Sequence, residues 1–172
     1  MSKMTMLSRR IRKIYLLRHG LFGKLAADLD IDMQQSPIIE YVRENPTCTQ
    51  VEIAKALAVS PASIALSTKR MQKAGLLKKE ADENDLRLNR LSATQKGLET
   101  CERCKGVAHS LNYQMFQGFS EEELEQLEIY LDRIIHNLSN DKAEEDFSLF
   151  SIIALENKLS FNEQERGKET DV

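Results

Sequence analysis

The sequence predicts a mainly α-helical protein with a small β-hairpin and long helices at both ends, a fold class that three observations indicate. Apolar residues recur at three- and four-residue spacing over long stretches with little glycine or proline, which is typical of helices that bury one face. Two short helical patterns are joined by a tight connection at Ala58-Val59, as in a helix-turn-helix. Leucines alternate with arginines between residues 86 and 91, which favours a two-stranded ribbon. Together these features predict a winged helix-turn-helix flanked by long N- and C-terminal helices.

Length, cysteine content and hydropathy narrow the class of protein. A chain of 172 residues corresponds to a single domain. Three cysteines do not make a disulfide framework, which favours a reducing compartment. No apolar run approaches the ~18 residues that a membrane span needs. Arg18 and His19 interrupt the apolar N-terminal stretch, which disfavours a secretory signal and leaves an amphipathic organelle presequence as the alternative. We therefore expect a cytoplasmic protein with no membrane partner.

Two helices are expected in the first quarter of the chain. The first runs from Ser8 to Leu29, because its apolar side chains form one stripe at helical spacing. The second begins at Ser36-Pro37, since a serine cap followed by proline is a typical helix start, and it ends near Asn45-Pro46. The stripe of the first helix consists of Ile11, Ile14, Tyr15, Leu21, Phe22, Leu25 and Leu29.

The helix-turn-helix is expected next. Thr49 and Glu52 have the spacing of a capping box, in which each side chain satisfies a free backbone N–H, and the helix that they open reaches Leu57. Ser60-Pro61 caps the following helix, which ends at Gly75, the residue type most common at that position.

A hairpin and two long helices follow. We expect strands at 76–79 and 89–93 around a loop at 81–88. Thr94 then caps a helix to Phe116, and Ser120 opens another in a second capping box. The segment from Asn140 is acidic. Its apolar part at 147–155 is expected either to pack on another part of the assembly or to fray, and the tail from Asn162 is expected to be disordered.

Charge is distributed unevenly, although the net value is only −3. Residues 1–27 carry seven Lys/Arg and no Asp/Glu, residues 60–96 carry eight against four, and residues 118–172 carry five against fifteen. A small total can hide a local basic footprint, and that footprint is what a polyanion meets.

Residues 49–97 contain five motifs in order: T-Q-x-E-I-A-x-x-L, V-S-P-A-S-I, A-G-L-L, D-E-N-D-x-R and T-x-K-G. With these motifs the chain resembles the MarR (multiple-antibiotic-resistance regulator) family of winged helix-turn-helix transcriptional regulators. The resemblance implies a homodimer whose first, fifth and sixth helices interlock, and a DNA affinity controlled by a small ligand or an oxidant. It also implies a wing pair formed by Asp85 and Arg87, a helix cap at Ser60 and a helix end at Gly75.

The expected domain organisation is one MarR-like domain over residues 1–140. Within it, residues 36–93 form the DNA-binding lobe, and residues 8–30 and 94–140 form dimerisation helices. Residues 141–172 are an acidic C-terminal extension, partly disordered.

The helix after Ser60 is the expected DNA-reading helix. At about 100° per residue, one of its faces packs on the preceding helix through Ile64, Thr68 and Met71. Its N-terminal part reaches base edges, where Leu66, in place of the family's frequent polar or basic reader, can touch only a thymine methyl; we therefore expect AT-rich half-sites. A second departure from the family is Ala93, in place of a common leucine. The expected DNA contacts are Ser60, Ala62, Ser63, Leu66, Lys69, Arg70 and Lys73 on the helix, and Arg87 and Arg90 on the wing.

Each of these assignments has a purely structural alternative. Lys69, Arg70 and Lys73 would meet phosphates, but the same residues also suit a solvated helix face. An arginine on the wing is attracted by a narrow minor groove, but Arg87 could instead form a salt bridge with Asp85.

Cysteines and rings suggest further sites. Cys48, Cys101 and Cys104 are candidate oxidation sensors, although small buried residues are the alternative. Cys101-x-x-Cys104 with His109 lacks a fourth ligand for tetrahedral zinc, so we expect no metal and no cofactor. A small-molecule effector could bind between the dimer helices and the lobe, with core packing as the alternative role for its candidate lining residues Tyr15, His19 and Tyr41.

These features predict a homodimeric transcriptional regulator, a repressor, that binds a near-palindromic operator in double-stranded DNA. No catalytic motif is visible, so we expect no enzyme. The alternative function is a winged helix used for protein docking or dimerisation without DNA; the dimerisation region of an enzyme is a weaker one, because no room remains for a catalytic domain.

Overall fold

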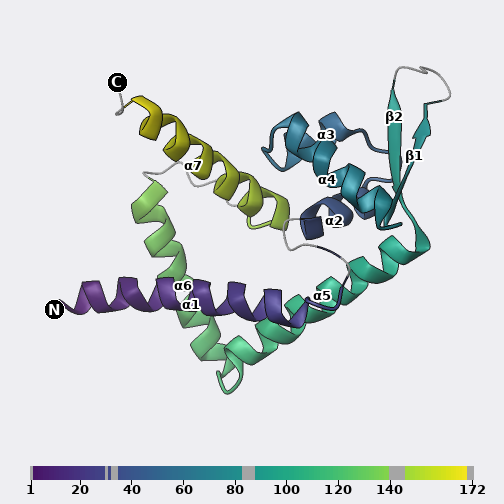
Figure 1. Cartoon of the computed structure of the whole chain (residues 1–172). Helices are drawn as coiled ribbons and strands as arrows, with labels where there is room; N and C mark the ends of the chain where they lie inside the picture. The colour runs from purple at the N-terminus through teal and green to yellow at the C-terminus, as the bar shows by residue number, and fades with distance from the viewer. Residues whose placement is uncertain (1, 30, 32–34, 83–87, 140–145, 170–172) are drawn as a thin grey trace.

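The computed structural model describes residues 2–29, 31, 35–82, 88–139 and 146–169, with side chains as far as residue 159. Helices α1, α2, α3 and α4 precede an antiparallel hairpin of β1 and β2, and α5, α6 and α7 follow it (Figure 1). This arrangement confirms the predicted fold class. The elements are α1 (Lys3–Leu25), α2 (Ser36–Glu44), α3 (Gln50–Ala56), α4 (Pro61–Lys73), β1 (Leu77–Ala81), β2 (Asn89–Ala93), α5 (Gln95–Phe116), α6 (Glu121–Ser139) and α7 (Leu149–Glu169).

Four of the predicted caps define where their helices begin, but the predicted cap Ser36 does not, because it lies inside α2, whose N-cap is Gln35 and which has no side-chain cap. Thr49 Oγ1 accepts from the Glu52 N–H at 3.2 Å, while the Glu52 carboxylate accepts from the Thr49 N–H at 2.6 Å. This is a complete capping box. Ser60 Oγ caps α4, Thr94 Oγ1 caps α5, and Ser120 with Glu123 forms the second predicted box.

Two helices differ from what the sequence predicted. Helix α1 begins at Lys3, because Ser2 Oγ accepts from the Thr5 N–H at 3.2 Å and caps it, and it ends at Leu25 instead of Leu29. Helix α7 continues to Glu169, so the tail expected to be disordered from Asn162 is helical in that range. Residues 160–169 contain no proline and are rich in glutamate, glutamine, arginine and lysine, which are good helix formers.

The main core lies where α2, α3, α4, the hairpin and the start of α5 meet. Its largest fully buried side chains belong to six residues from these segments and their junctions. The start of α5 enters this core through Cys101. The six residues are Ile39, Ile53, Ile64, Met71, Leu76 and Leu91.

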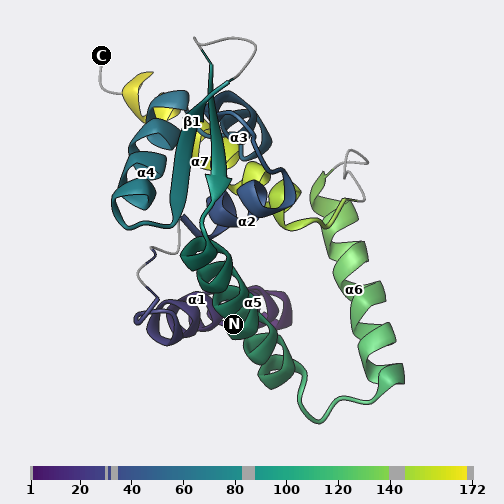
Figure 2. The same cartoon turned by 90° about the vertical axis from the view of Figure 1, so that its right-hand side faces the viewer.

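Helices α1 and α6 have no buried residue, and Figures 1 and 2 show α6 standing apart from α2, α3 and α4. Both helices expose large apolar side chains, among them Leu7, Ile11, Ile14 and Leu17 on α1 and Ile129, Leu131, Ile134 and Leu138 on α6. Monomeric proteins rarely expose contiguous apolar surface of this extent.

Among the described residues, no single helix is long and apolar enough to cross a membrane; the bent pair α3 and α4, at 118° to each other, passes that test only when combined.

Candidate nucleic-acid interface

Helix α4 buries one face and exposes the other, as predicted. Ile64, Thr68 and Met71 are buried against the lobe. Thr68 Oγ1 donates to the Ile64 carbonyl at 2.8 Å and accepts from Gln50 Nε2 of α3 at 2.7 Å. The bond with Gln50, which no local sequence pattern predicts, joins the two helices of the motif. The exposed face comprises Ala62, Ser63, Leu66, Lys69, Arg70 and Lys73, with the cap Ser60 at its N-terminal end.

That exposed face has an apolar start and a cationic end. The Leu66 side chain is 53% exposed, which suits contact with an apolar base group. Three cationic side chains, Lys69, Arg70 and Lys73, follow within the last two turns. They are also well placed beside the negative end of the helix dipole, so α4 itself helps to hold the charge there.

The wing is a regular antiparallel ribbon in which Leu77 pairs with Ala93 and Glu80 with Arg90. The Arg90 guanidinium donates to the Asp82 carboxylate at 2.6 Å and to the Thr47 carbonyl at 3.4 Å. Arg90 therefore has two partners within the protein, and its predicted contact with DNA stays a prediction. The ion pair between Arg90 and Asp82 joins β2 to the residue that follows β1.

The other predicted wing residues, Asp85 and Arg87, lie outside the described residues.

The base of the wing is tied to the ends of α4 and α5. Thr94 Oγ1 donates to the Gly75 carbonyl at 2.6 Å, and Gly75 has a φ of 74°, which favours glycine. Lys96 Nζ donates to the Ala74 carbonyl at 3.0 Å. Lys96 was counted in the basic footprint, but it acts as a C-cap for α4. The T-x-K-G motif directly after the wing was the signal for this role.

The sequence model of the MarR family matches residues 29–88, which span α2, α3, α4, β1 and the end of the segment before α2. This chain carries a MarR-family winged helix. The match covers the helix-turn-helix and the first strand of the wing, and it therefore includes every predicted DNA contact except Arg90.

Solved structures agree with the MarR-family fold over most of the chain. The transcriptional regulator SlyA is 28% identical, with a TM-score of 0.59 over 78% of this chain and 95% of its own. A mutant of MarR from E. coli complexed with operator DNA is 23% identical, with a TM-score of 0.60 over 74% of this chain and 92% of its own. A mutant of MepR from S. aureus bound to an oligodeoxyribonucleotide is 22% identical, with a TM-score of 0.61 over 77% and 97%.

The three candidate effector residues do not line one pocket. The rings of Tyr15 and His19 lie 6.0 Å apart on α1, where Tyr15 is exposed and donates to Glu156 of α7 at 3.0 Å. This bond raises the pKa of Tyr15. Tyr41 instead packs edge-on against Phe150 of α7, with 5.5 Å between ring centroids. Packing was the alternative role for these residues, and it describes Tyr41.

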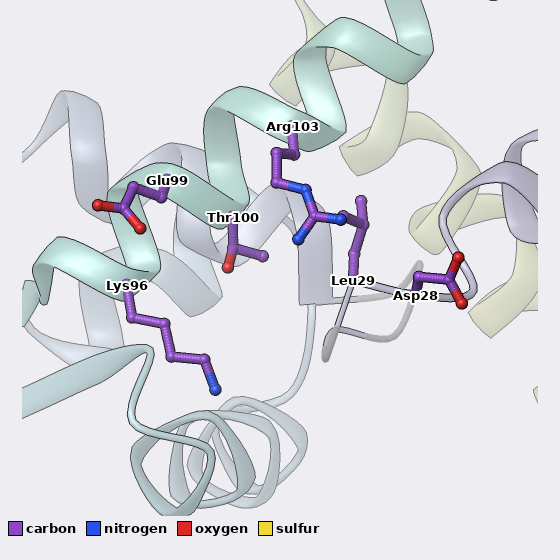
Figure 3. Close-up of a pocket in the computed structure, with 6 residues that line it drawn as sticks. All are labelled: Asp28, Leu29, Lys96, Glu99, Thr100 and Arg103. Carbon is purple, nitrogen blue, oxygen red and sulfur yellow. The ribbon is translucent and has the colours of Figure 1, made fainter.

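A small cavity of about 220 Å³ lies elsewhere, between the end of α1 and the first turns of α5 (Figure 3). It is below the roughly 300–1,000 Å³ of typical ligand pockets. Its lining is largely charged and consists of Asp28, Leu29, Lys96, Glu99, Thr100 and Arg103.

The cysteines have the properties of core residues. Cys48, Cys101 and Cys104 are buried and free. Burial raises the pKa of the Cys48 and Cys101 thiols to about 11, and it also raises the pKa of Cys104. A sensor cysteine needs a lowered pKa and access to the oxidant, so this environment opposes the oxidant-sensing interpretation. His109 is exposed, on a different face from the two buried α5 thiols, and the described part of the chain contains no group of three metal-ligating side chains.

Proposed function

We propose that this chain is a DNA-binding transcriptional regulator that acts as a homodimer and inserts α4 into the major groove. The observation that carries the proposal is the exposed face of α4, where Leu66 is followed by Lys69, Arg70 and Lys73 beside the wing. An apolar start can read base edges and a cationic end can bind phosphates. The DNA-bound relatives described above support this assignment, since their structures share this fold.

The homodimer part of the proposal explains the exposed apolar faces of α1 and α6. A second copy would cover them, and the charges of the two ends are complementary. Residues 1–27 carry seven cationic and no acidic residues, whereas residues 118–172 carry fifteen acidic against five cationic residues. The basic α1 of one copy would therefore favour the acidic C-terminal part of the other. Such a dimer would present two α4 helices to successive major grooves about one helical turn apart.

The proposal includes repression and control by a small molecule. A dimer seated on an operator excludes other proteins from it, so loss of the chain should raise transcription from its target promoter. A ligand that changes the distance between the two lobes would weaken docking. The cavity beside the start of α5 is smaller than a typical ligand pocket, so this part of the proposal rests on the resemblance to the family.

The test is the salt dependence of binding to promoter DNA. Each phosphate that a lysine neutralises contributes about 0.9 to the slope of log K against log salt. We expect Lys69→Ala and Lys73→Ala each to weaken binding and to reduce the slope by about 1, and the double variant by about 2. Fluorescence anisotropy over a salt series measures both quantities.

Lys158→Ala provides the matched control, because Lys158 is an exposed lysine on α7, away from the proposed interface. It should leave the affinity and the slope unchanged. Equal slopes for the wild type and the double variant would overturn the proposed role of α4. Absence of DNA binding by the wild type at any salt would favour the alternative of a protein-docking winged helix.

A further inference from the structure

Helix α7 is attached to the winged helix at two points. Phe150 packs edge-on against Tyr41 of α2, and both Phe150 and Ile153 pack against the main core. One turn further on, Asn157 Nδ2 donates to the Leu57 carbonyl at 2.8 Å across 100 residues of sequence. The three α7 residues share one face, since they are spaced three and four apart.

The second of these attachments lies at a sensitive place. Leu57 is the C-cap of α3, and the connection that follows it contains Ala58, at a φ of 50°, and leads directly to α4. The carbonyl that Asn157 binds therefore belongs to the turn of the helix-turn-helix. The exposed face of α4 stays exposed with α7 in place, so this contact does not obstruct the DNA-reading surface.

The same helix is also attached to α1. Tyr15 of α1 donates to Glu156, the residue next to Asn157, at 3.0 Å. Figures 1 and 2 show α7 beside the winged helix. The lobe is joined to α1 and α5 along the chain, and the ion pairs Arg43–Glu102 and Lys105–Glu40 hold α2 to α5. Helix α7 adds a further, non-covalent connection between the lobe and α1.

We propose that α7 is a positioning element that sets the orientation of α4 relative to the long helices, with Phe150 and Asn157 as its positioning residues. The inference rests on the proposed function, because the orientation matters when two α4 helices must meet two half-sites. A lobe that is also held by α7 can rotate less than a lobe held only through α1 and α5. The dimer should then tolerate only one distance between half-sites, and release of α7 should widen the tolerated range at some loss of affinity for the best site.

The experiment compares operators that differ only in half-site spacing. Inserting about two base pairs moves the half-sites by roughly 7 Å and turns them by about 70°. The full-length wild type is compared with Phe150→Ala/Asn157→Asp, which removes the ring contact and the amide donor, and with the exposed-site control Lys158→Ala. We expect the wild type and the control to prefer the natural spacing by on the order of tenfold, and the double variant to show a preference about threefold smaller.

Two further measurements make the result decisive. Hydrogen exchange of the α7 amides reports whether α7 is released. When Phe150→Leu takes the place of Phe150→Ala, part of the spacing preference should return, because an apolar side chain again fills the site. A lower melting temperature with an unchanged spacing preference would show a merely structural role and overturn the inference. Retained protection of α7 in the double variant would overturn it too, since these contacts would not be what holds the helix. A wild type that binds no operator at all would instead refute the proposed function.

Discussion

Gly97, in the first turn of α5, is the position where the fold leaves least room for a side chain. A Cβ on Gly97 would lie 2.0 Å from the Leu76 carbonyl oxygen and 3.2 Å from Ile39 Cδ1. The first distance is about 1 Å shorter than the closest approach that real Cβ atoms show. The obstructing atom is backbone, and it accepts hydrogen bonds from Thr94 N at 3.0 Å and Thr94 Oγ1 at 3.2 Å. Gly97→Ala must therefore displace the base of the wing.

The expected cost combines three contributions. Overpacking of this kind costs about 1–3 kcal/mol, and weakening the hydrogen bonds to Leu76 adds about 1 kcal/mol. Alanine favours the helix over glycine by up to about 1 kcal/mol, which offsets part of this cost. The net loss in the free energy of unfolding is about 1–3 kcal/mol, which corresponds to a fall of roughly 2–12 °C in melting temperature for a chain of this size.

Thermal denaturation at one protein concentration measures this loss, and Gly106→Ala is the matched control. Gly106 lies in the same helix, and a Cβ there would meet nothing within 4 Å. We expect Gly106→Ala to raise the stability by about 0.5–1 kcal/mol through the helix preference alone. The reasoning is refuted if Gly97→Ala melts at or above the temperature of the wild type.

Two other outcomes are expected. Because burial raises the pKa of Cys48 and Cys101 to about 11 from 9.0, their contribution to stability is complete below pH 9 and is lost as the pH rises from about 9 to 11. Urea denaturation at pH 8 and pH 10 should show this loss, and the loss should be smaller in Cys48→Ala/Cys101→Ala; an equal loss in both proteins would contradict the assignment. Leu66→Ala should weaken operator binding as much as replacing the contacted thymine by uracil, because either change removes the same methyl contact. Additive losses in the doubly changed complex would argue against that contact.

The sequence was sufficient to predict the elements whose formation depends on residues close together in the chain. The capping boxes at Thr49 and Ser120 and the cap at Ser60 each involve residues three positions apart, so their geometry follows from the local order of side chains. The limits of β2 and the division of α4 into a buried and an exposed face were likewise predicted, because the spacing of apolar residues determines which side of a helix faces the core.

The tertiary structure decided the partners of polar and aromatic side chains. The particular ion pair of Arg90 with Asp82 was not predicted, because it depends on how the two strands of the hairpin pair. Tyr41 was a candidate for an effector pocket, but Phe150 covers it from a helix whose packing the sequence left open.

Long-range contacts explain why these outcomes could not be predicted from the sequence. Asn157 and Leu57 are 100 residues apart, and Tyr15 and Glu156 are 141 apart. No periodicity or local motif encodes such pairs, because they form only once the lobe, α1 and α7 have reached their places. The sequence therefore determined the helices and strands as far as α6, and the packing of distant segments determined the partners of polar and aromatic side chains and the place of α7.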